Sequence, residues 1–312
     1  MRFVRVLSSL ALLFINFASA QSFKEALSLG GYLSIKAGID DREREISLDE
    51  AALIVGYDAL NWRFLMELEA EDPYRRLFGD VDEETTHLHV NIERLFVERH
   101  LTNDASIRVG QFFSPIGFWN TYPINVLRDT TSDPTFVDAL FPRLSSGLLY
   151  TSVFDDGQWH VMIQPTEEID DRQEVLRSKN HFYTSLDLYG DEDEWRIGAG
   201  YATLKDGPGR GYATLGWRRD LTHWTLLAEG GVVKREGDRR LFYDLYLQSV
   251  WHFADKHDAI VRLERFDLGD RDDTKGIFGY TWRPERWLAC KGEWDWSAHE
   301  EARWLFSFSF LF

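Results

Sequence analysis

The chain has 312 residues, of which 15% are aromatic and 28% are charged, and its formal net charge is −17. This acidic balance argues against a nucleic-acid-binding function, because neutralising phosphates requires a basic face, and the aromatic content argues against a disordered chain. Cys290 is the single cysteine of the sequence, so no intramolecular disulfide can form.

The first element in chain order is a predicted export signal. Residues 1–20 contain no acid, and Arg2 and Arg5 precede an apolar run that ends in Ala18-Ser19-Ala20. A basic start, an apolar middle and an A-x-A end are typical of a secretory signal peptide. We therefore expect cleavage after Ala20. The mature chain 21–312 then carries 33 basic and 52 acidic residues, a balance of −19.

The rest of the chain has the rhythm of β-strands. Beyond residue 20, no stretch approaches the roughly 18 consecutive apolar residues of a membrane helix, which excludes a helical membrane protein. In the segment 62–69, apolar Trp62 and Phe64 alternate with charged Arg63 and Glu67. The same alternation recurs in the segments 195–202, 243–252, 259–264 and 288–295. One apolar face and one polar face at period two predict strands that lie between lipid and water.

Two segments interrupt this rhythm. Between 88 and 100 the apolar positions change phase from Ile92 to Leu95, which predicts a bulge near Glu93. In the segment 148–154, the alternation does not show which residues face inward and which face outward.

The connections between these segments alternate in length. Short turns are expected near 59–60, 102–104, 155–157, 191–193, 220–222, 255–257 and 284–285. Longer, charged connections are expected near 40–46, 71–87, 113–144, 166–180, 205–210, 235–239, 268–274 and 297–301. Seven turns and eight longer connections join about sixteen strands. The expected fold is all-β, a transmembrane antiparallel up-and-down β-barrel, and a barrel of this size encloses an aqueous channel.

The connection 113–145 is the longest, and it follows the fifth predicted strand. Loops of this length without regular structure are usually functional. The preceding stretch RVGQFFSPIGFWN (108–120) resembles the R-x-G-x-F-x-x-P-x-G sequence of the porin family that includes the phosphate-selective porins. The chain departs from that group in being short and in lacking a dense basic ladder. The resemblance implies an outer-membrane diffusion channel, often a homotrimer, in which 113–145 folds toward the lumen as a constriction loop.

The last strand carries an aromatic face. Every second residue from Trp304 to Phe312 is aromatic, and a terminal Phe preceded by this pattern resembles the targeting signal of Gram-negative outer-membrane proteins. This resemblance assigns targeting to Phe308, Phe310 and Phe312, and implies contact with the barrel assembly machinery and with outer-membrane lipid. The alternative is an ordinary C-terminal strand whose aromatic face is buried.

Permeation needs a water-filled bore lined by charges rather than a catalyst. The phase of the alternation predicts an inward basic set of Lys36, Arg63, Arg108, Arg196, Arg218, Arg262, Lys291 and Arg303. The inward acidic set is Glu67, Glu98, Asp187, Glu229, Asp244, Glu264, Glu293 and Asp295. Candidates in the constriction loop are Pro115, Trp119, Asn120, Arg128, Asp129 and Asp133, with Asp138 and Arg143 as further charges.

Arg108 is the leading selectivity candidate, because it opens the motif that begins the long connection. The alternative for each wall charge is a solvated or paired residue far from the narrowest point. The alternative for Pro115, Gly117 and Trp119 is that they only turn the chain and fix the loop to the wall.

The surplus of acid lies in the connections, at 40–45, 80–84, 167–171 and 269–273. On an outer surface, such clusters suit divalent cations that bridge lipopolysaccharide, or they are simply solvated. They also repel anions, which favours cations or neutral solutes.

The favoured function is a passive porin for small hydrophilic solutes or ions, in the outer membrane of a Gram-negative bacterium. A non-conducting structural or adhesive barrel that acts through its acidic loops is the second hypothesis, and an outer-membrane hydrolase is the third. No Ser stands in a nucleophile motif and the nine histidines lack metal spacing, so we expect no enzyme, metal or cofactor.

Overall fold

The computed structural model describes residues 26–79, 82–86, 88–122, 124–167, 169, 176–299 and 301–312. The predicted signal peptide, residues 1–20, lies outside the described residues, as do parts of the acidic connections at 80–84 and 167–171.

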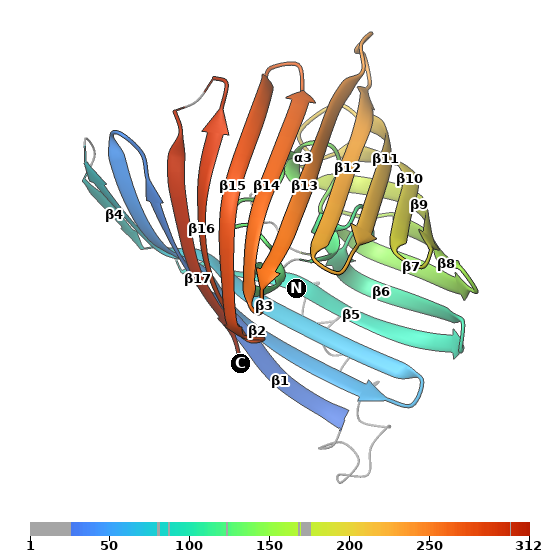
Figure 1. Cartoon of the computed structure of the whole chain (residues 1–312). Coiled ribbons are helices and arrows are strands. Elements are labelled where there is room, and N and C mark those ends of the chain that lie inside the picture. Colours follow the sequence, from blue (N-terminus) through green and yellow to red (C-terminus); the bar gives the residue numbers. More distant parts are fainter. Residues whose placement is uncertain are drawn as a thin grey trace.

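The described chain is built almost entirely of strands that follow one another around a ring (Figure 1). The strands of the first half are β1 (Leu27–Ile39), β2 (Glu43–Ala59), β3 (Trp62–Gly79), β4 (Glu83–Thr86), β5 (Val90–Thr102), β6 (Ala105–Phe113), β7 (Leu144–Phe154) and β8 (Gly157–Gln164). Those of the second half are β9 (Ser178–Tyr189), β10 (Asp193–Leu204), β11 (Arg210–Asp220), β12 (Trp224–Arg235), β13 (Phe242–Ala254), β14 (His257–Asp267), β15 (Asp272–Glu285), β16 (Leu288–Ser297) and β17 (Arg303–Leu311).

The ring is closed and antiparallel. Apart from β4 and β5, whose described residues do not pair with each other, consecutive strands pair, and β1 pairs with β17, from Tyr32 opposite Leu311 to Ile39 opposite Trp304. Strands β4 and β5 both pair with β3, β4 with residues 74–77 and β5 with residues 62–70, so the two share one position in the wall. The predicted barrel of about sixteen strands is thereby confirmed, and closure leaves no sheet edge exposed to lipid.

Two strands are longer than predicted. The segments 43–46 and 71–79, expected in connections, belong to β2 and β3, which pair with each other as far as Glu43 opposite Gly79. Their charged residues are compatible with strand structure because the backbone pairing does not depend on the side chains, and because Arg75 of β3 pairs with Glu45 of β2 at 2.7 Å.

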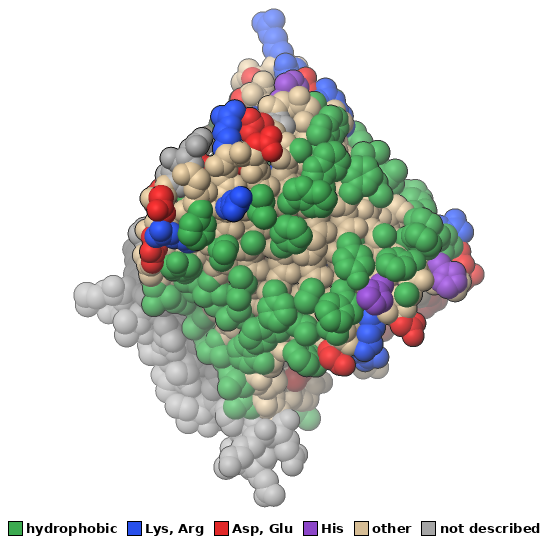
Figure 2. Space-filling model, turned by 60° about the vertical axis from the view of Figure 1, so that its left-hand side comes forward, with side chains coloured by type: hydrophobic (Ala, Val, Ile, Leu, Met, Phe, Trp, Pro, Cys, Tyr) green, Lys and Arg blue, Asp and Glu red, His purple; other side chains and the backbone are tan. Residues whose placement is uncertain are grey.

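The two-residue alternation sets the two faces of the wall. On β17, Trp304, Phe306 and Phe308 are exposed on the outer face, whereas Leu305 and Ser307 are buried on the inner face. The expectation of an outward aromatic face is therefore confirmed, and the alternative of a buried C-terminal strand is wrong. Figure 2 shows hydrophobic side chains over the middle of one side of the barrel, with charged side chains toward its margins. Such a band is what lipid contact requires.

The interruptions of the rhythm also have a structural explanation. In the pairing of β3 with β5, Glu67 lies opposite Arg94 and Leu68 lies opposite Ile92, so Glu93 is the extra residue of a bulge, as predicted. In β7 the phase is settled, because Leu148 is 39% exposed and Leu149 is 5% exposed. No helix among the described residues is long and apolar enough to cross a membrane.

The hydrophobic core lies inside the ring, between the wall and the connection that follows β6. Phe136 of this connection packs edge-on against Phe141, with ring centroids 5.2 Å apart, and against Tyr246 of β13 at 6.2 Å. Tyr183 and Tyr212 of β9 and β11 stack at 6.0 Å and extend the cluster. The expectation of a polar or charged inner face is therefore wrong for this part of the wall. A segment folded inward must bury its own apolar side chains against apolar partners.

Candidate functional site

The connection between β6 and β7, residues 114–143, forms an inner loop that lies within the barrel (Figure 1). It contains two short 3₁₀ turns, η1 (Trp119–Thr121) and η2 (Asn125–Leu127), and a one-turn helix, α3 (Thr135–Ala139). The expected inward fold of the long loop after the fifth wall strand is confirmed. Its role as a constriction remains a prediction.

The base of the inner loop is closed by hydrogen bonds between its two ends. The Ser114 backbone N–H donates to the Arg143 carbonyl at 2.8 Å, and the Ser114 hydroxyl donates to the Pro142 carbonyl at 2.8 Å. The Asn120 side-chain amide donates to the carbonyls of Ser114 and Arg143 at 2.7 and 3.1 Å. Asn120, a predicted loop residue, therefore braces the base of the loop rather than facing a solute.

Acidic wall residues hold the backbone of the inner loop. Glu229 of β12 is buried and accepts hydrogen bonds from the backbone N–H groups of Phe118 and Trp119 and from the Tyr246 hydroxyl. The approach is close: Gly117 has φ +67°, and a Cβ at this position would lie 2.4 Å from the Glu229 Oε1 atom. Only glycine meets both conditions without strain.

Two further carboxylates have the same role. Glu293 of β16 accepts from the backbone N–H groups of Thr131 and Ser132 at 2.8 and 2.9 Å. Glu264 of β14 accepts from the Thr135 N–H at 2.6 Å. These carboxylates satisfy loop N–H groups that have no helix or sheet to pair with, as buried backbone donors require.

Basic wall residues hold the loop oxygen atoms. Arg262 donates to the Thr130 hydroxyl at 2.9 Å and to the carbonyl and hydroxyl of Ser132 at 3.1 and 2.9 Å. Lys291 donates to the backbone carbonyl of Asn125, to the side-chain oxygen of the same residue at 2.7 Å and to the Thr130 carbonyl at 3.1 Å.

Arginines also fix the part of the inner loop around Trp119. Arg196 of β10 donates to the Gly117 carbonyl and, at 3.2 Å, to the Thr121 hydroxyl. The guanidinium carbons of Arg128 and Arg262 lie 5.8 and 5.4 Å from the centroid of the buried Trp119 ring. The predicted pore charges that are engaged with the loop are thus Arg196, Glu229, Arg262, Glu264, Lys291 and Glu293.

Most of the other predicted wall charges lie in ion pairs. Asp244 of β13 is an exception: it is 0% exposed, and neither of its carboxylate oxygens has a hydrogen-bond partner in the part of the chain that the structure describes. Arg108 donates to the Glu98 Oε2 atom at 2.8 and 3.0 Å, and its guanidinium carbon lies 4.3 Å from the centroid of the Phe96 ring. The remaining pairs are Arg94 with Glu67, Arg303 with Asp295 at 3.2 Å, Arg63 with Asp58 at 3.8 Å, Arg196 with Asp187 at 3.2 Å, Arg218 with Asp220 at 2.9 Å and Lys36 with Asp49 at 3.7 Å. The structure does not bring these predicted residues together into one ring.

On the side of the inner loop that faces β2 and β3, acids and bases balance. Arg128 pairs with Asp133 at 2.7 Å, and Arg143 lies 3.8 Å from Asp133 and 3.9 Å from Asp138. Burial opposes ionisation of Asp133, but Arg128 and Arg143 outweigh it and lower the pKa of this carboxyl below its ordinary value. Burial raises the pKa of Asp138 despite Arg143. Asp129 is turned to the wall, where Arg283 lies 3.3 Å away.

Sequence reasoning missed the residues that face this side of the loop. They are carboxylates on β2 and β3, which we call the acidic wall: Asp49, Glu50, Glu67, Glu69 and Glu71. Only Glu67 was predicted. Glu71 falls in the segment 71–87 that the sequence predicts as a connection. The irregularity at Asp49, where the pairing with β3 passes from Leu48 opposite Tyr74 to Glu50 opposite Glu71, interrupts the alternation on β2.

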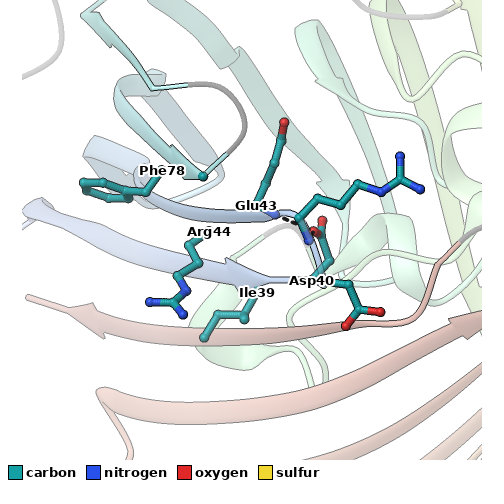
Figure 3. A pocket seen from close by; sticks show the side chains of 8 residues that line it. Ile39, Asp40, Glu43, Arg44 and Phe78 are labelled. Carbon is teal, nitrogen blue, oxygen red and sulfur yellow. Dashed lines mark hydrogen bonds between the residues drawn. The ribbon is translucent and has the colours of Figure 1, made fainter.

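Two features outside the inner loop bear on metal and ligand binding. Among the described residues, no group of three or more His, Cys, Asp or Glu side chains could hold a metal ion. A small pocket at the β1–β2 connection is lined by Ile39, Asp40, Glu43, Arg44 and Phe78, among others (Figure 3). Asp40 there accepts hydrogen bonds from the N–H groups of Arg42 and Glu43 at 2.8 and 2.7 Å, which lower the pKa of its carboxyl. This acid is used to form the turn.

Comparison with known proteins identifies the fold. No protein-family model matches the sequence, and no curated protein sequence matches it. Among solved structures, OmpF of Salmonella typhi in complex with daunomycin has a TM-score of 0.69 at 9% identity, covering 92% of this chain and 97% of that chain. The anion-selective porin from Comamonas acidovorans has a TM-score of 0.66 at 12% identity, covering 92% of this chain and 99% of that chain.

OmpT, an outer-membrane protein of Vibrio cholerae, has a TM-score of 0.64 at 11% identity, covering 92% of this chain and 97% of that chain. Another structure of the same protein is described as its trimer form, with a TM-score of 0.63. At these identities the likeness shows a shared fold, the closed barrel of outer-membrane porins.

Proposed function

We propose that this protein is an outer-membrane porin, a passive diffusion channel for small hydrophilic solutes or ions that performs no enzymatic step. The observation that carries the proposal is the inner loop, which is held on one side of the lumen by buried wall charges. On the other side, Glu71 is exposed, and Lys36, Asp49 and Glu50 are half-buried. A fixed insert that narrows a barrel along one wall, with charged side chains on the other, is the arrangement a selective pore requires.

The proposal extends to location and assembly. Residues 1–20 serve as a signal peptide, the aromatic C-terminus with Phe308, Phe310 and Phe312 is recognised by the barrel assembly machinery, and the outer aromatic band contacts lipid and lipopolysaccharide. The trimer form of the Vibrio protein and the resemblance at 108–120 both support a homotrimer. We do not extend that resemblance to phosphate, because the acidic wall disfavours anions.

The contact between Ser145 and His181 in the lumen does not support the hydrolase hypothesis. The Ser145 hydroxyl lies 2.9 Å from the Nδ1 atom of His181, but these residues are 0% and 2% exposed. The other ring nitrogen of His181 contacts the Tyr212 hydroxyl, and Ser145 also contacts Ser114 at 2.9 Å. A nucleophile needs access to substrate, so we assign this network to support of the loop base. No observation favours the adhesive barrel.

Conductance in planar lipid bilayers tests the proposal. The purified, folded chain should produce discrete current steps in 1 M KCl, and heat-denatured protein should produce none. Native gel mobility before and after heating should show a trimer that dissociates. A folded barrel that inserts into the bilayer without current steps would overturn the porin proposal and favour the non-conducting alternative.

A further inference from the structure

The acidic wall is shaped by an irregularity in two neighbouring strands. In the pairing of β1 with β2, Ser34 lies opposite Glu50 and Ile35 lies opposite Leu48. Asp49 of β2 is therefore an extra residue. On β3 the register skips at the same level, from Tyr74 opposite Leu48 to Glu71 opposite Glu50. Bulges re-aim side chains. Here Asp49 and Glu50, adjacent in sequence, both reach the lumen: Asp49 lies near Lys36 and Asn125, and Glu50 lies in the electrostatic field of Arg128 and Asp133.

The carboxylates continue along β3 beside this irregularity. Glu67, Glu69 and Glu71 alternate with Leu68 and Ala70, which places all three on the inner face. The Tyr32 hydroxyl donates to Glu69 at 2.9 Å. The acidic wall therefore spans two strands and about three pleats of the inner surface.

The acidic wall has fewer cations than acids. Leaving Glu69 aside, the cations among the described residues that bridge to Asp49, Glu50, Glu67 and Glu71 are Lys36, 3.7 Å from Asp49, and Arg94, which pairs with Glu67. Arg94 also lies near the loop base, where its guanidinium carbon is 5.6 Å from the centroid of the Phe113 ring. The inner loop opposite is balanced by the Arg128, Arg143, Asp133 and Asp138 pairs. Of the two facing surfaces, the inner loop is thus neutral and the acidic wall carries excess negative charge.

A second observation points to a cation independently of the charge balance. Three buried oxygen atoms in this region have no hydrogen-bond partner: Oε2 of Glu50, Oε1 of Glu67 and Oδ1 of Asn91. Glu67 and Asn91 are 0% and 4% exposed, and Asn91 lies directly opposite Glu69 in the pairing of β3 with β5. Buried acceptors without a donor cost free energy unless water or a cation satisfies them. All three atoms are acceptors, so a cation satisfies them and an anion does not.

We infer that the acidic wall is a cation-binding selectivity site, through which small cations permeate in preference to anions. The inference rests on the proposed porin function and adds the class of solute and the residues that select it. It differs from an effect of the acidic outer connections, because the charge lies within the barrel opposite the inner loop.

The reversal potential in a KCl gradient tests the inference on the native protein. We expect a potential of cation sign, with K⁺ preferred over Cl⁻ about tenfold, in line with the concentrating effect of one-sign clefts. Replacing two wall carboxylates, in the variant E50Q/E71Q, should lower this ratio at least about threefold with the step conductance retained. The matched control D41N/D270N removes two exposed outer carboxylates and should leave the ratio unchanged.

Each outcome bears on a separate claim. Current steps with an anion-directed potential would overturn the inference and leave the porin function standing. An equal fall in the ratio for D41N/D270N and E50Q/E71Q would place selectivity at the outer connections, and would also overturn it. The absence of current steps would overturn the porin function itself.

A second measurement needs no variant. MgCl₂ added to the native channel in KCl should reduce the K⁺ current, because a divalent cation screens the excess negative charge of the acidic wall more strongly than K⁺ does. A current that is insensitive to Mg²⁺, together with an unchanged ratio in E50Q/E71Q, would contradict a cation site at the acidic wall.

Discussion

The two sides of the lumen use charge in opposite ways. On the side of β10, β12, β14 and β16, buried charged side chains form hydrogen bonds with the inner loop. Glu229, for example, accepts from the backbone N–H groups of Phe118 and Trp119. On the side of β2 and β3, Glu50 and Glu71 lie beside other acids. The function of an inward charge therefore depends on whether the inner loop covers it.

This difference has a physical origin in desolvation. A charge covered by the loop loses its water and must be compensated by hydrogen bonds, so it becomes part of the fold. A charge that keeps contact with the water of the lumen can exchange that water for a passing ion. Substitutions on the first side should therefore change stability and loop rigidity, and those on the second side should change selectivity.

Removing the Trp119 ring should have the largest effect. The ring is buried, and the guanidinium carbons of Arg128 and Arg262 lie 5.8 and 5.4 Å from its centroid. W119A should lower the free energy of unfolding in detergent micelles by about 3–5 kcal/mol, the usual cost of truncating a buried Trp, and should make the channel current fluctuate. W119F keeps an aromatic ring beside the two arginines and should recover most of both properties. Equal behaviour of W119A and the native protein would contradict the assignment of Trp119 as a loop anchor.

Removing the Glu229 carboxylate should have the next largest effect. E229A leaves the N–H groups of Phe118 and Trp119 without their acceptor, which should cost about 3 kcal/mol of unfolding free energy and increase current noise. E229Q retains an acceptor oxygen and should lose less. The control is E285A, at the exposed end of β15, where Glu285 lies 3.7 Å from Lys256. A loss in E285A as large as in E229A would show that burial and loop contact are not the cause.

Arg108 should have the smallest effect, contrary to its rank in the sequence analysis. Because Glu98 neutralises it, R108A should leave the step conductance intact and shift the reversal potential slightly toward cations, by freeing one carboxylate. The shift should be smaller than the opposite shift of E50Q/E71Q. If R108A instead abolished selectivity, the motif 108–120 rather than the acidic wall would control permeation.

The sequence predicted the wall better than it predicted the lumen. Period two assigns each strand residue to a face, so the closed barrel, the bulge at Glu93 and the inward direction of Glu229 or Arg262 could be anticipated. The alternation does not show which other segment of the chain the inner face contacts. The contact of Glu229 with Phe118 joins residues far apart in the chain, and it depends on where the loop folds. The aromatic cluster of Tyr183, Tyr212 and Tyr246 could not be predicted for the same reason.

The central claim is that the inner loop covers one side of the lumen and leaves the exposed part of the acidic wall, at Glu71, open to solutes. Two single-cysteine variants in a Cys290→Ser background test it: Glu71→Cys on the acidic wall, and Thr214→Cys, whose position is buried in the aromatic cluster on β11. A small cationic methanethiosulfonate reagent added during bilayer recording should reduce the current through the Glu71→Cys channel within minutes and leave the Thr214→Cys channel unchanged. Block at position 214 without block at position 71 would contradict the account.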